Sequence, residues 1–491
     1  MTSQPQVGSQ YHHFVPRFIL RNFAHPFEPP NTPEGSRKRG KRKWKKGYYP
    51  GDLVLHTINL AGTTGELAEA PVSHAFGLTD MYRDFAKAAN QHHIEEQLSV
   101  LESLAAQITT RIRKEYEAGK QEVWLSRLER DNLRRFLFIM KYRNTGSHKR
   151  FYHQTAEDYS GGDKEELVQY MREKGYQKPV DVWLDSIKAI LEMEMDPERK
   201  WIDKLRERMF PADANWAIAH MQMMYLAVCT PSSQDGEFLL TENAYSIYEG
   251  PVSYQVDPNT GESVMKCYTE FHVFAPVSPK LIIVLRSVLL PAPEEDLNDG
   301  IREWRAMMYK MNAGQHNNPS EAGSSLEDLP IARARNSYTR VVNGRETLAD
   351  GEDGSLRANH KFCFRFFPIS TEHVNKINCF MLEESISIST IAFKTQLAAR
   401  KTLEYYLGTS FETGGSCIFK AVLGEPDDPR LALLKKLEQA LRQLGSDTTA
   451  VYHVQKSELR GQILSRSNTQ VPQESLPREP TKTMKLYAKL G

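Results

Sequence analysis

The strongest constraint on the fold of this chain is a helical pattern between about His92 and Ala118. Apolar residues recur there at a period of about 3.6, which places them in one narrow stripe along a helix. The stripe consists of Ile94, Leu98, Leu101, Ala105, Ile108 and Ile112. Glu95 and Glu102 are seven residues apart and flank the stripe on the same side. The segment predicts one long helix that buries its apolar face and carries two carboxylates at the edge of the core.

Several other segments share this helical pattern. The apolar residues between about Ser126 and Tyr142 predict a second amphipathic helix soon after the first. Further helices are expected at residues 164–175, 181–193, 198–209, 215–228, 297–311, 371–383, 388–407 and 430–444. The region before residue 230 is therefore expected to be mainly helical.

After residue 236 the pattern changes to short apolar runs bounded by turn residues, which is typical of strands. Strands are expected at residues 237–240, 246–255, 265–275 and 281–285, and also at 51–60, 361–367 and 416–422. Successive short strands joined by turns favour antiparallel pairing. The predicted fold class is α+β, with a mainly helical domain packed against an antiparallel sheet that is formed by the 237–286 region.

Composition divides the 491 residues into one domain with interruptions. The expected segments are a flexible N-terminus at 1–9, the first part of the domain at 10–314, a disordered insertion at 315–360, the C-terminal helical part of the same domain at 361–445, and a flexible tail at 446–491. A Pro- and Gly-rich basic loop is expected at 27–47 within the first part. The insertion is assigned because its residues are rich in Gly, Ser, Asn and Asp and include few large apolar groups.

Cysteine usage and hydropathy indicate an intracellular protein. The five cysteines are scattered and form no C-x-x-C pair, so neither a disulfide framework nor a zinc ribbon is indicated. Apolar runs stay well short of the roughly 18 residues that a membrane-spanning helix needs. The N-terminal residues do not have the pattern of a secretory signal. The expected location is the cytoplasm or the nucleus, with no membrane as a partner.

A basic cluster at residues 37–46 carries eight Lys or Arg and no acid. The net charge of the chain is +1, so the remainder of the chain carries a net charge of −7. The cluster could be a solvated loop, a nuclear-import signal or a contact for nucleic acid. Nucleic acid is not favoured as a partner, because a mildly acidic body attracts a phosphate backbone poorly.

The segment QYHHFVPRFILRNFA, at residues 10–24, places polar side chains inside an apolar run. His12 or His13 could bind a metal or transfer a proton, or their ring nitrogens could simply bond to carbonyl groups in the core. Arg17 and Arg21 are four residues apart and could hold a phosphate or carboxylate, or could pair with Glu95 or Glu102. Both alternatives are open for each pair.

This opening segment resembles the start of an uncharacterised family called domain of unknown function 4238. Later blocks are also similar to that family and occur in its order over residues 10–407. They are Ile94–Leu98 with Glu102, Phe238–Asn243, Phe274–Lys280, and Ile377 with Asn378. The chain departs from the pattern at Glu242 and Ala244, where the family usually has Asp and Pro. The resemblance implies a shared fold and implies no activity.

Thr241, Glu242 and Asn243 follow an apolar run at a turn, where such side chains either cap the backbone or act as ligands at the end of a strand. With the resemblance taken into account, the candidate residues fall into three roles. Candidate catalytic residues are His12, His13, Glu102 and Glu242; candidate ligand-binding residues are Arg17, Arg21, Asn22, Thr241 and Asn243; and a divalent metal, the one cofactor considered, would be held by His13, Glu95 and Glu102.

Three classes of function remain open. The first is a metal-dependent hydrolase, with phosphodiesters as a candidate substrate. The second is a non-enzymatic binding or regulatory module for an anionic ligand or a protein partner. The third is a scaffold in which the polar motifs are structural.

A nuclease of the His-Asn-His kind fits the sequence less well. Its motif would start at His12 and His13 and include Asn59 and His74, but the spacing from His13 to Asn59 is too long. Motifs of nucleophilic hydrolases and P-loops are absent from the sequence.

Overall fold

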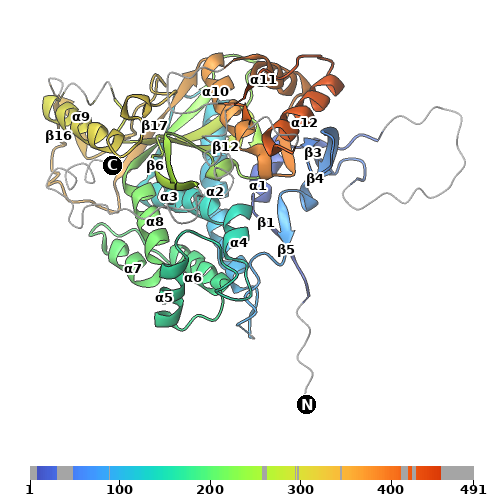
Figure 1. Ribbon diagram of the computed structural model, residues 1–491. Helices are drawn as coiled ribbons and strands as arrows, with labels where there is room; N and C mark the ends of the chain where they lie inside the picture. The colour runs from blue at the N-terminus through green and yellow to red at the C-terminus, as the bar shows by residue number, and fades with distance from the viewer. Residues whose placement is uncertain are drawn as a thin grey trace, which may run out of the picture.

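A mixed β-sheet lies at the centre of the molecule, with helices on both of its faces (Figure 1). The computed structural model describes residues 8–29, 48–87, 89–256, 263–292, 295, 298–342, 345–410, 419–422 and 427–454. The basic cluster at 37–46 and residues 455–491 of the expected tail lie outside these described residues.

The central sheet has seven strands within the described residues. Their order is β14 (Arg335–Asn336), β17 (Lys361–Ile369), β7 (Met224–Pro231), β13 (Leu281–Ser287), β12 (His272–Ser278) and β9 (Tyr248–Glu249), and β6 (Glu122–Ser126) also pairs with β17. Strands β17 and β7 pair in parallel, whereas β13 pairs antiparallel with both β7 and β12.

Strand β13 separates two hydrophobic cores. Leu281 and Leu285 face the first core, whereas Ile282 and Val284 face the second. Because side chains alternate along a strand, a single strand contributes to both cores. Burial on both faces explains why β13 is a continuous apolar run in the sequence and does not alternate with polar residues.

Helices from the first half of the chain cover one face of the sheet, and helices from the C-terminal part cover the other (Figure 1). The first core includes α2 (His93–Glu117), α3 (Arg127–Tyr142), α6 (Pro179–Leu191) and α8 (Pro211–Gln222). The second core includes α10 (Thr371–Glu383), α11 (Gln396–Gly408) and α12 (Pro429–Gln443). The other helices are α1 (Arg17–Phe23), α4 (Thr145–Phe151), α5 (Lys164–Lys174), α7 (Lys200–Arg208) and α9 (Asp299–Ala313).

A second sheet, of five strands, joins segments from the beginning and the end of the sequence. Strand β3 pairs antiparallel with β4 along one edge and with β2 and β18 along the other. Strand β18 in turn pairs with β8. The bounds are β2 (His25–Pro26), β3 (Leu53–Asn59), β4 (Glu66–Pro71), β8 (Leu240–Thr241) and β18 (Thr390–Phe393).

Smaller elements complete the described part of the chain. Two-stranded pairs are formed by β1 (Tyr11–His13) with β5 (Gly77–Thr79), β10 (Val252–Val256) with β11 (Ser263–Tyr268), β15 (Thr339–Val342) with β16 (Arg345–Leu348), and β19 (Ala421–Val422) with β20 (His453–Val454). Single 3-10 turns are η1 (Val72–His74), η2 (Ala244–Ser246), η3 (Pro319–Glu321) and η4 (Ser385–Ser387).

The predicted α+β fold class is confirmed, as is the long helix on which it was based. Helix α2 occupies residues 93–117, and all six residues of its predicted stripe are buried. Helices α3, α5, α6, α7, α9, α10 and α12 also lie where helices were expected, to within a few residues at each end.

The prediction of one helix over residues 215–228 is wrong in its second half. Helix α8 ends at Gln222, and residues 224–231 form β7. Every residue of β7 is buried, and a fully buried strand shows no alternation that distinguishes it from a buried helix. The same ambiguity affects residues 388–407, where β18 precedes α11.

The expectation of an antiparallel sheet formed by residues 237–286 is confirmed for the pairings within that region, since β12 pairs antiparallel with β9 and β13, and β10 pairs antiparallel with β11. Only β9, β12 and β13 of that region enter the central sheet, which is mixed because β7 and β17 pair in parallel. Residues 237–239 form no strand, and β8 pairs with β18 in the other sheet. Tertiary pairing with distant segments decided this arrangement.

Residues 315–360 are not a disordered insertion, since nearly all of them are described and several are buried. Leu326, Leu329 and Ile331 enter the second core. The hydroxyl of Ser324 and the backbone N–H of Ser325 donate to the carboxylate of Glu249 at 2.9 and 2.8 Å. A few apolar anchors and side-chain hydrogen bonds order this polar segment, and composition alone does not reveal them. Residues 446–454 of the expected tail are ordered as well and include β20.

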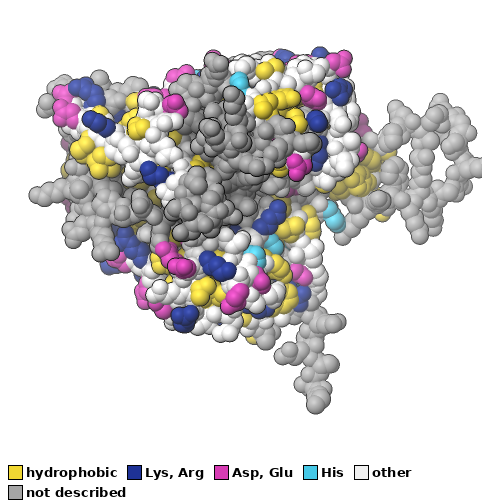
Figure 2. Space-filling view, viewed as in Figure 1, with side chains coloured by type: hydrophobic (Ala, Val, Ile, Leu, Met, Phe, Trp, Pro, Cys, Tyr) yellow, Lys and Arg dark blue, Asp and Glu magenta, His cyan; other side chains and the backbone are white. Residues whose placement is uncertain are grey.

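Both signs of charge are present on the surface of the described part. Figure 2 shows Lys and Arg side chains interspersed with Asp and Glu on this face of the molecule. Among the described residues, no helix combines the length and apolar character that crossing a bilayer requires.

Candidate functional site

The first of the two adjacent histidines is a neutral core residue. Nδ1 of His12 accepts a hydrogen bond from the backbone N–H of Tyr82 at 3.0 Å, and the two rings stack with centroids 5.6 Å apart. Burial, together with the neighbouring His92, lowers the pKa of His12 to about 4. Its Nε2 has no hydrogen-bond partner among the described residues.

The second histidine is half-buried and is tied to the backbone. Nε2 of His13 lies 3.1 Å from the carbonyl oxygen of Val72, which can only accept, so Nε2 carries the proton. Burial lowers the pKa of His13 to about 4, and the nearby cations Arg17 and Arg143 act in the same direction. His13 is therefore neutral at physiological pH.

Helix α2 brings both predicted glutamates to Arg143, the residue that follows α3. Nη2 of Arg143 lies 2.5 Å from Oε1 of Glu102, and the Arg143 side chain is fully buried. The hydroxyl of Tyr82 donates to the carbonyl oxygen of Arg143 at 2.9 Å. We call Tyr82, Glu95, Glu102 and Arg143 the Arg143 cluster.

Glu95 is the unusual group of this cluster. Burial raises the pKa of Glu95 to about 7, even though the positive charge of Arg143 acts in the opposite direction. Oε2 of Glu95, and Nε and Nη1 of Arg143, are buried and lack a hydrogen-bond partner within the described part of the chain. Buried polar atoms normally have partners, so unpaired atoms on two adjacent charged groups indicate a place for a ligand or an ordered water.

A pocket of about 70 Å³ is lined by Asn144, the residue after Arg143, and by Asn243. The residues of the Arg143 cluster do not line it. Tyr245 is close to Asn243 in sequence. Burial raises the pKa of Tyr245, and the charge of Arg143 acts in the opposite direction, so the two side chains lie near each other. The residues lining this amide pocket are Asn144, Thr145, Gly146, Asn243, Ser246, Ile247, Tyr248, Gly250, Val252, Phe380, Glu384, Ser387 and Ile388.

The three residues of the predicted turn site are held in a network of their own. Oγ1 of Thr241 donates to Oδ1 of Asn243 at 2.9 Å, and Nδ2 of Asn243 donates to the carbonyl oxygen of Glu384 at 2.8 Å. The carboxylate of Glu242 accepts from the backbone N–H of Ser389 at 3.1 Å and from its hydroxyl. These bonds fasten the turn to η4 and to the start of β18.

The polar residues of α1 point in different directions. Arg17 and Arg21 are exposed. The side-chain amide of Asn22 donates to the carbonyl oxygen of Val277 at 2.8 Å and thereby fixes α1 against β12.

A model of the family described as Protein of unknown function (DUF4238) matches residues 11–396. The chain belongs to this family. The DUF4238 match spans the Arg143 cluster and the amide pocket and ends where α11 begins. No curated protein and no solved structure matches the chain.

Of the candidate residues in this DUF4238 protein, the structure brings Glu95 and Glu102 together at Arg143, near His13. It places Thr241, Glu242 and Asn243 in the turn network, where only Asn243 lines the pocket. Arg143 itself was not predicted. A cation at the C-terminal end of a helix is ordinarily explained by the helix dipole, so nothing in the sequence singles out Arg143.

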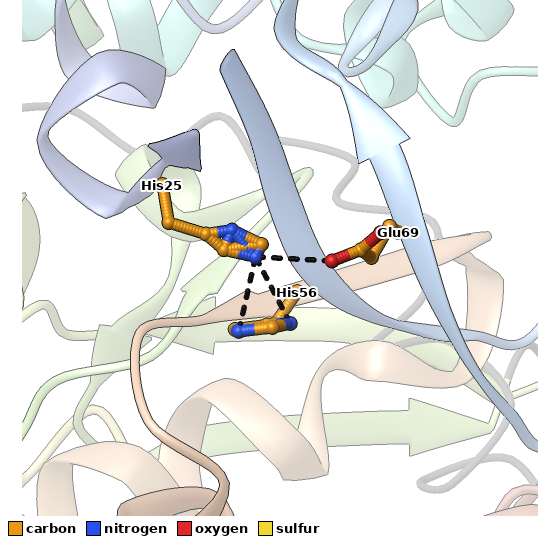
Figure 3. Close-up of side chains that lie close together, drawn as sticks. All are labelled: His25, His56 and Glu69. Carbon is orange, nitrogen blue, oxygen red and sulfur yellow. Dashed lines mark hydrogen bonds and ion pairs between the residues drawn. The ribbon is translucent and has the colours of Figure 1, made fainter. Parts of the chain in front are cut away.

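One group of side chains in the described residues with the ligand atoms to hold a metal ion was not predicted either. It consists of His25, His56 and Glu69, whose ligand atoms lie within 4.8 Å of one another (Figure 3). None of these three belongs to the predicted metal set of His13, Glu95 and Glu102.

The raised pKa of Glu95 predicts a pH-dependent stability. A carboxyl group whose pKa is higher in the folded state supports folding at low pH, and this contribution is lost as the pH rises through about 7. Glutamine resembles the protonated acid. We therefore expect Glu95→Gln to raise the melting temperature at pH 8 and to change it little at pH 4.5. The neighbouring Glu96→Gln, at an exposed position, serves as the control in thermal melts at both pH values. An equal shift for Glu95→Gln at both pH values would contradict the assignment.

Proposed function

We propose that this protein is a hydrolase in which Glu95 acts as the general base. The observation that carries the proposal is the half-buried carboxyl group of Glu95, whose Oε2 lacks a hydrogen-bond partner among the described residues and whose pKa is raised to about 7 beside the buried Arg143. A base with a pKa near the working pH is ionised in a substantial fraction of the molecules and is strong enough to take a proton from water. Perturbed groups of this kind are concentrated at functional sites.

The cluster also favours a substrate that carries an anionic group, such as a phosphodiester. Nε and Nη1 of Arg143 have no partner within the described residues, and a guanidinium group binds phosphate oxygens through such donors. Asn144 and Asn243 each use Nδ2 for one backbone carbonyl, which leaves a second amide hydrogen available toward the pocket. In this proposal Arg143 holds the anionic group and Glu95 activates the attacking water.

A divalent metal on His13, Glu95 and Glu102 would supply the same nucleophile by a different route. Existing charges oppose that arrangement, because Glu102 is paired with Arg143 and the cations Arg17 and Arg143 lie close to His13. We therefore assign the hydrolytic role to Glu95 and leave the metal out of this proposal.

The test is hydrolysis of chromogenic nitrophenyl esters, with a phosphodiester, a phosphomonoester and a carboxylic ester compared side by side. We expect the phosphodiester to be cleaved, with a rate that rises with pH to a plateau above about pH 7. Glu95→Gln should lower kcat by about 100-fold or more, the usual contribution of a general base. Glu96→Gln should keep the wild-type rate.

Two results would argue against this function. One is a wild-type protein that hydrolyses none of the three esters, and the other is a Glu95→Gln variant as active as Glu96→Gln. If hydrolysis is absent but inorganic phosphate raises the melting temperature more than chloride at equal ionic strength, the second class of function gains support. That class is a non-enzymatic module for an anionic ligand, and the specific observation in its favour is that Nε and Nη1 of Arg143 have no hydrogen-bond partner within the described part of the chain.

A further inference from the structure

Three side chains on the five-stranded sheet converge on one point outside the Arg143 cluster (Figure 3). Nε2 of His25 lies 3.1 Å from Nε2 of His56 and 3.2 Å from Oε1 of Glu69. A histidine nitrogen carries at most one hydrogen, so Nε2 of His25 cannot donate to both neighbours at once. Hydrogen bonding alone leaves this arrangement incompletely explained.

We propose that His25, His56 and Glu69 bind a divalent first-row transition metal ion, with zinc as the probe. Two imidazoles and one carboxylate are a ligand set that such ions accept, and zinc sites with three protein ligands commonly take a fourth ligand from solvent. The inference goes beyond the proposed hydrolase and does not depend on it.

The strand register explains how the three ligands come to share a face. His56 on β3 is directly opposite Glu69 on β4, and His25 on β2 is opposite Val54, two residues before His56. Residues two apart on a strand point to the same side of a sheet. The ligands therefore come from three adjacent strands, and their spacing is set by backbone pairing.

Two of the distances between the ligand atoms agree with a tetrahedral site. Zinc bonds to imidazole nitrogen and carboxylate oxygen are about 2.0–2.1 Å long, which places neighbouring ligand atoms roughly 3.3 Å apart in tetrahedral geometry. The separations of 3.1 and 3.2 Å around Nε2 of His25 are close to that value. The two imidazole rings are perpendicular, with centroids 3.8 Å apart, and Nε2 of His25 also lies 3.4 Å from Nδ1 of His56, so one ring rotates when both bind the same ion.

The surroundings hold one ligand ring in place and leave the other two ligands accessible from solvent. His56 stacks on Phe393, with ring centroids 5.7 Å apart, which fixes its ring. The side chains of His25 and Glu69 are 21% and 35% exposed, so an ion can enter without unfolding of the sheet.

One nearby charge opposes cation binding. The ammonium group of Lys394 donates to the carbonyl oxygen of Ala24 at 2.5 Å and lies close enough to His56 to affect its pKa. Glu69 supplies the negative charge that offsets Lys394. Neutralising Glu69 should therefore weaken metal binding clearly. Glu69 is also partly exposed, so the substitution removes no buried side chain.

The experiment is a calorimetric titration of the chelator-treated full-length protein with Zn²⁺, supported by the visible absorption of added Co²⁺. We expect the wild-type protein to bind zinc, and we expect Glu69→Gln and His56→Ala to lower the zinc affinity by about 100-fold or more. Loss of even a supporting group around a metal lowers the affinity roughly 10–100-fold. His93→Ala is the matched control, since His93 also pairs with a carboxylate, Asp84, at 2.8 Å.

The inference fails if the wild-type protein binds no zinc, or if both triad variants bind zinc as tightly as His93→Ala does. A purely hydrogen-bonded cluster would give the second result together with a lower melting temperature. Circular dichroism checks that each variant is folded. If His56→Ala does not fold, the partly exposed Glu69→Gln decides the question alone.

Discussion

Replacing Arg143 with methionine is expected to lower the free energy of unfolding by about 3 kcal/mol, the lower end of the range for breaking a buried ion pair. The Arg143 side chain is fully buried, and its loss leaves Glu95 and Glu102 as two neighbouring carboxyl groups with no cation between them. The pKa of Glu95 should then rise further above 7, because the opposing effect of Arg143 is removed. Urea denaturation followed by tryptophan fluorescence measures the first effect.

A double mutant separates the ion pair from simple packing. Arg143→Met combined with Glu102→Gln should recover part of the lost stability, since the stranded charge is then removed as well. The surface pair of Arg111 and Glu129 is the control, with side chains 40% and 30% exposed. Arg111→Met should cost less than about 1 kcal/mol. If Arg143→Met costs no more than Arg111→Met, the cluster is not the electrostatic unit described here.

The second large effect is expected at Glu383, at the end of α10. Its carboxylate accepts from the hydroxyl of Tyr406 at 2.7 Å and from the backbone N–H of Lys420 at 3.1 Å, and it is paired with Arg430. The side chains of Glu383 and Arg430 are 2% and 3% exposed. Glu383→Ala leaves the buried Arg430 charge without its carboxylate and should cost about 3–5 kcal/mol.

This network fastens α12 to α10, although α12 lies beyond the end of the family match at residue 396. Chemical denaturation of Glu383→Ala therefore tests whether the C-terminal helix is part of the cooperative unit. The control is Glu372→Ala on the same helix, where the side chain is 66% exposed and pairs with Lys376. That control should cost less than about 1 kcal/mol. Equal losses for the two variants would show that the Glu383 network contributes little.

Periodicity predicted the helices that bury one face, but it assigned β7, a strand that is buried on both faces, to a helix. Helix α2 was predicted to within a residue or two because its stripe and its polar flank are distinct. Strand β7 was read as helix because Met224–Pro231 is buried throughout and has no polar side to show its period. A mixed sheet of this kind also depends on pairing between distant segments, which local patterns do not encode.

For the candidate site, the sequence analysis named the two glutamates and did not name the arginine that lies beside them. Glu95 and Glu102 were placed on one edge of a helix by their spacing, and they share Arg143. The sequence does not show which of the chain's many cations they meet, because that depends on how α2 packs against α3. The triad of His25, His56 and Glu69 was invisible for the same reason, since β2, β3 and β4 bring its members together only after the sheet has formed.

The pairing of β3 with β18 has a consequence for biosynthesis. Residues 53–59 leave the ribosome long before residues 390–393, so the edge of β3 at residues 56–59, which β2 does not cover, stays open during most of translation. An open strand edge is a template for pairing with other chains. Nascent or truncated forms that end before residue 390 should therefore need chaperone protection, and pairing with residues 390–393 is the step that closes this edge.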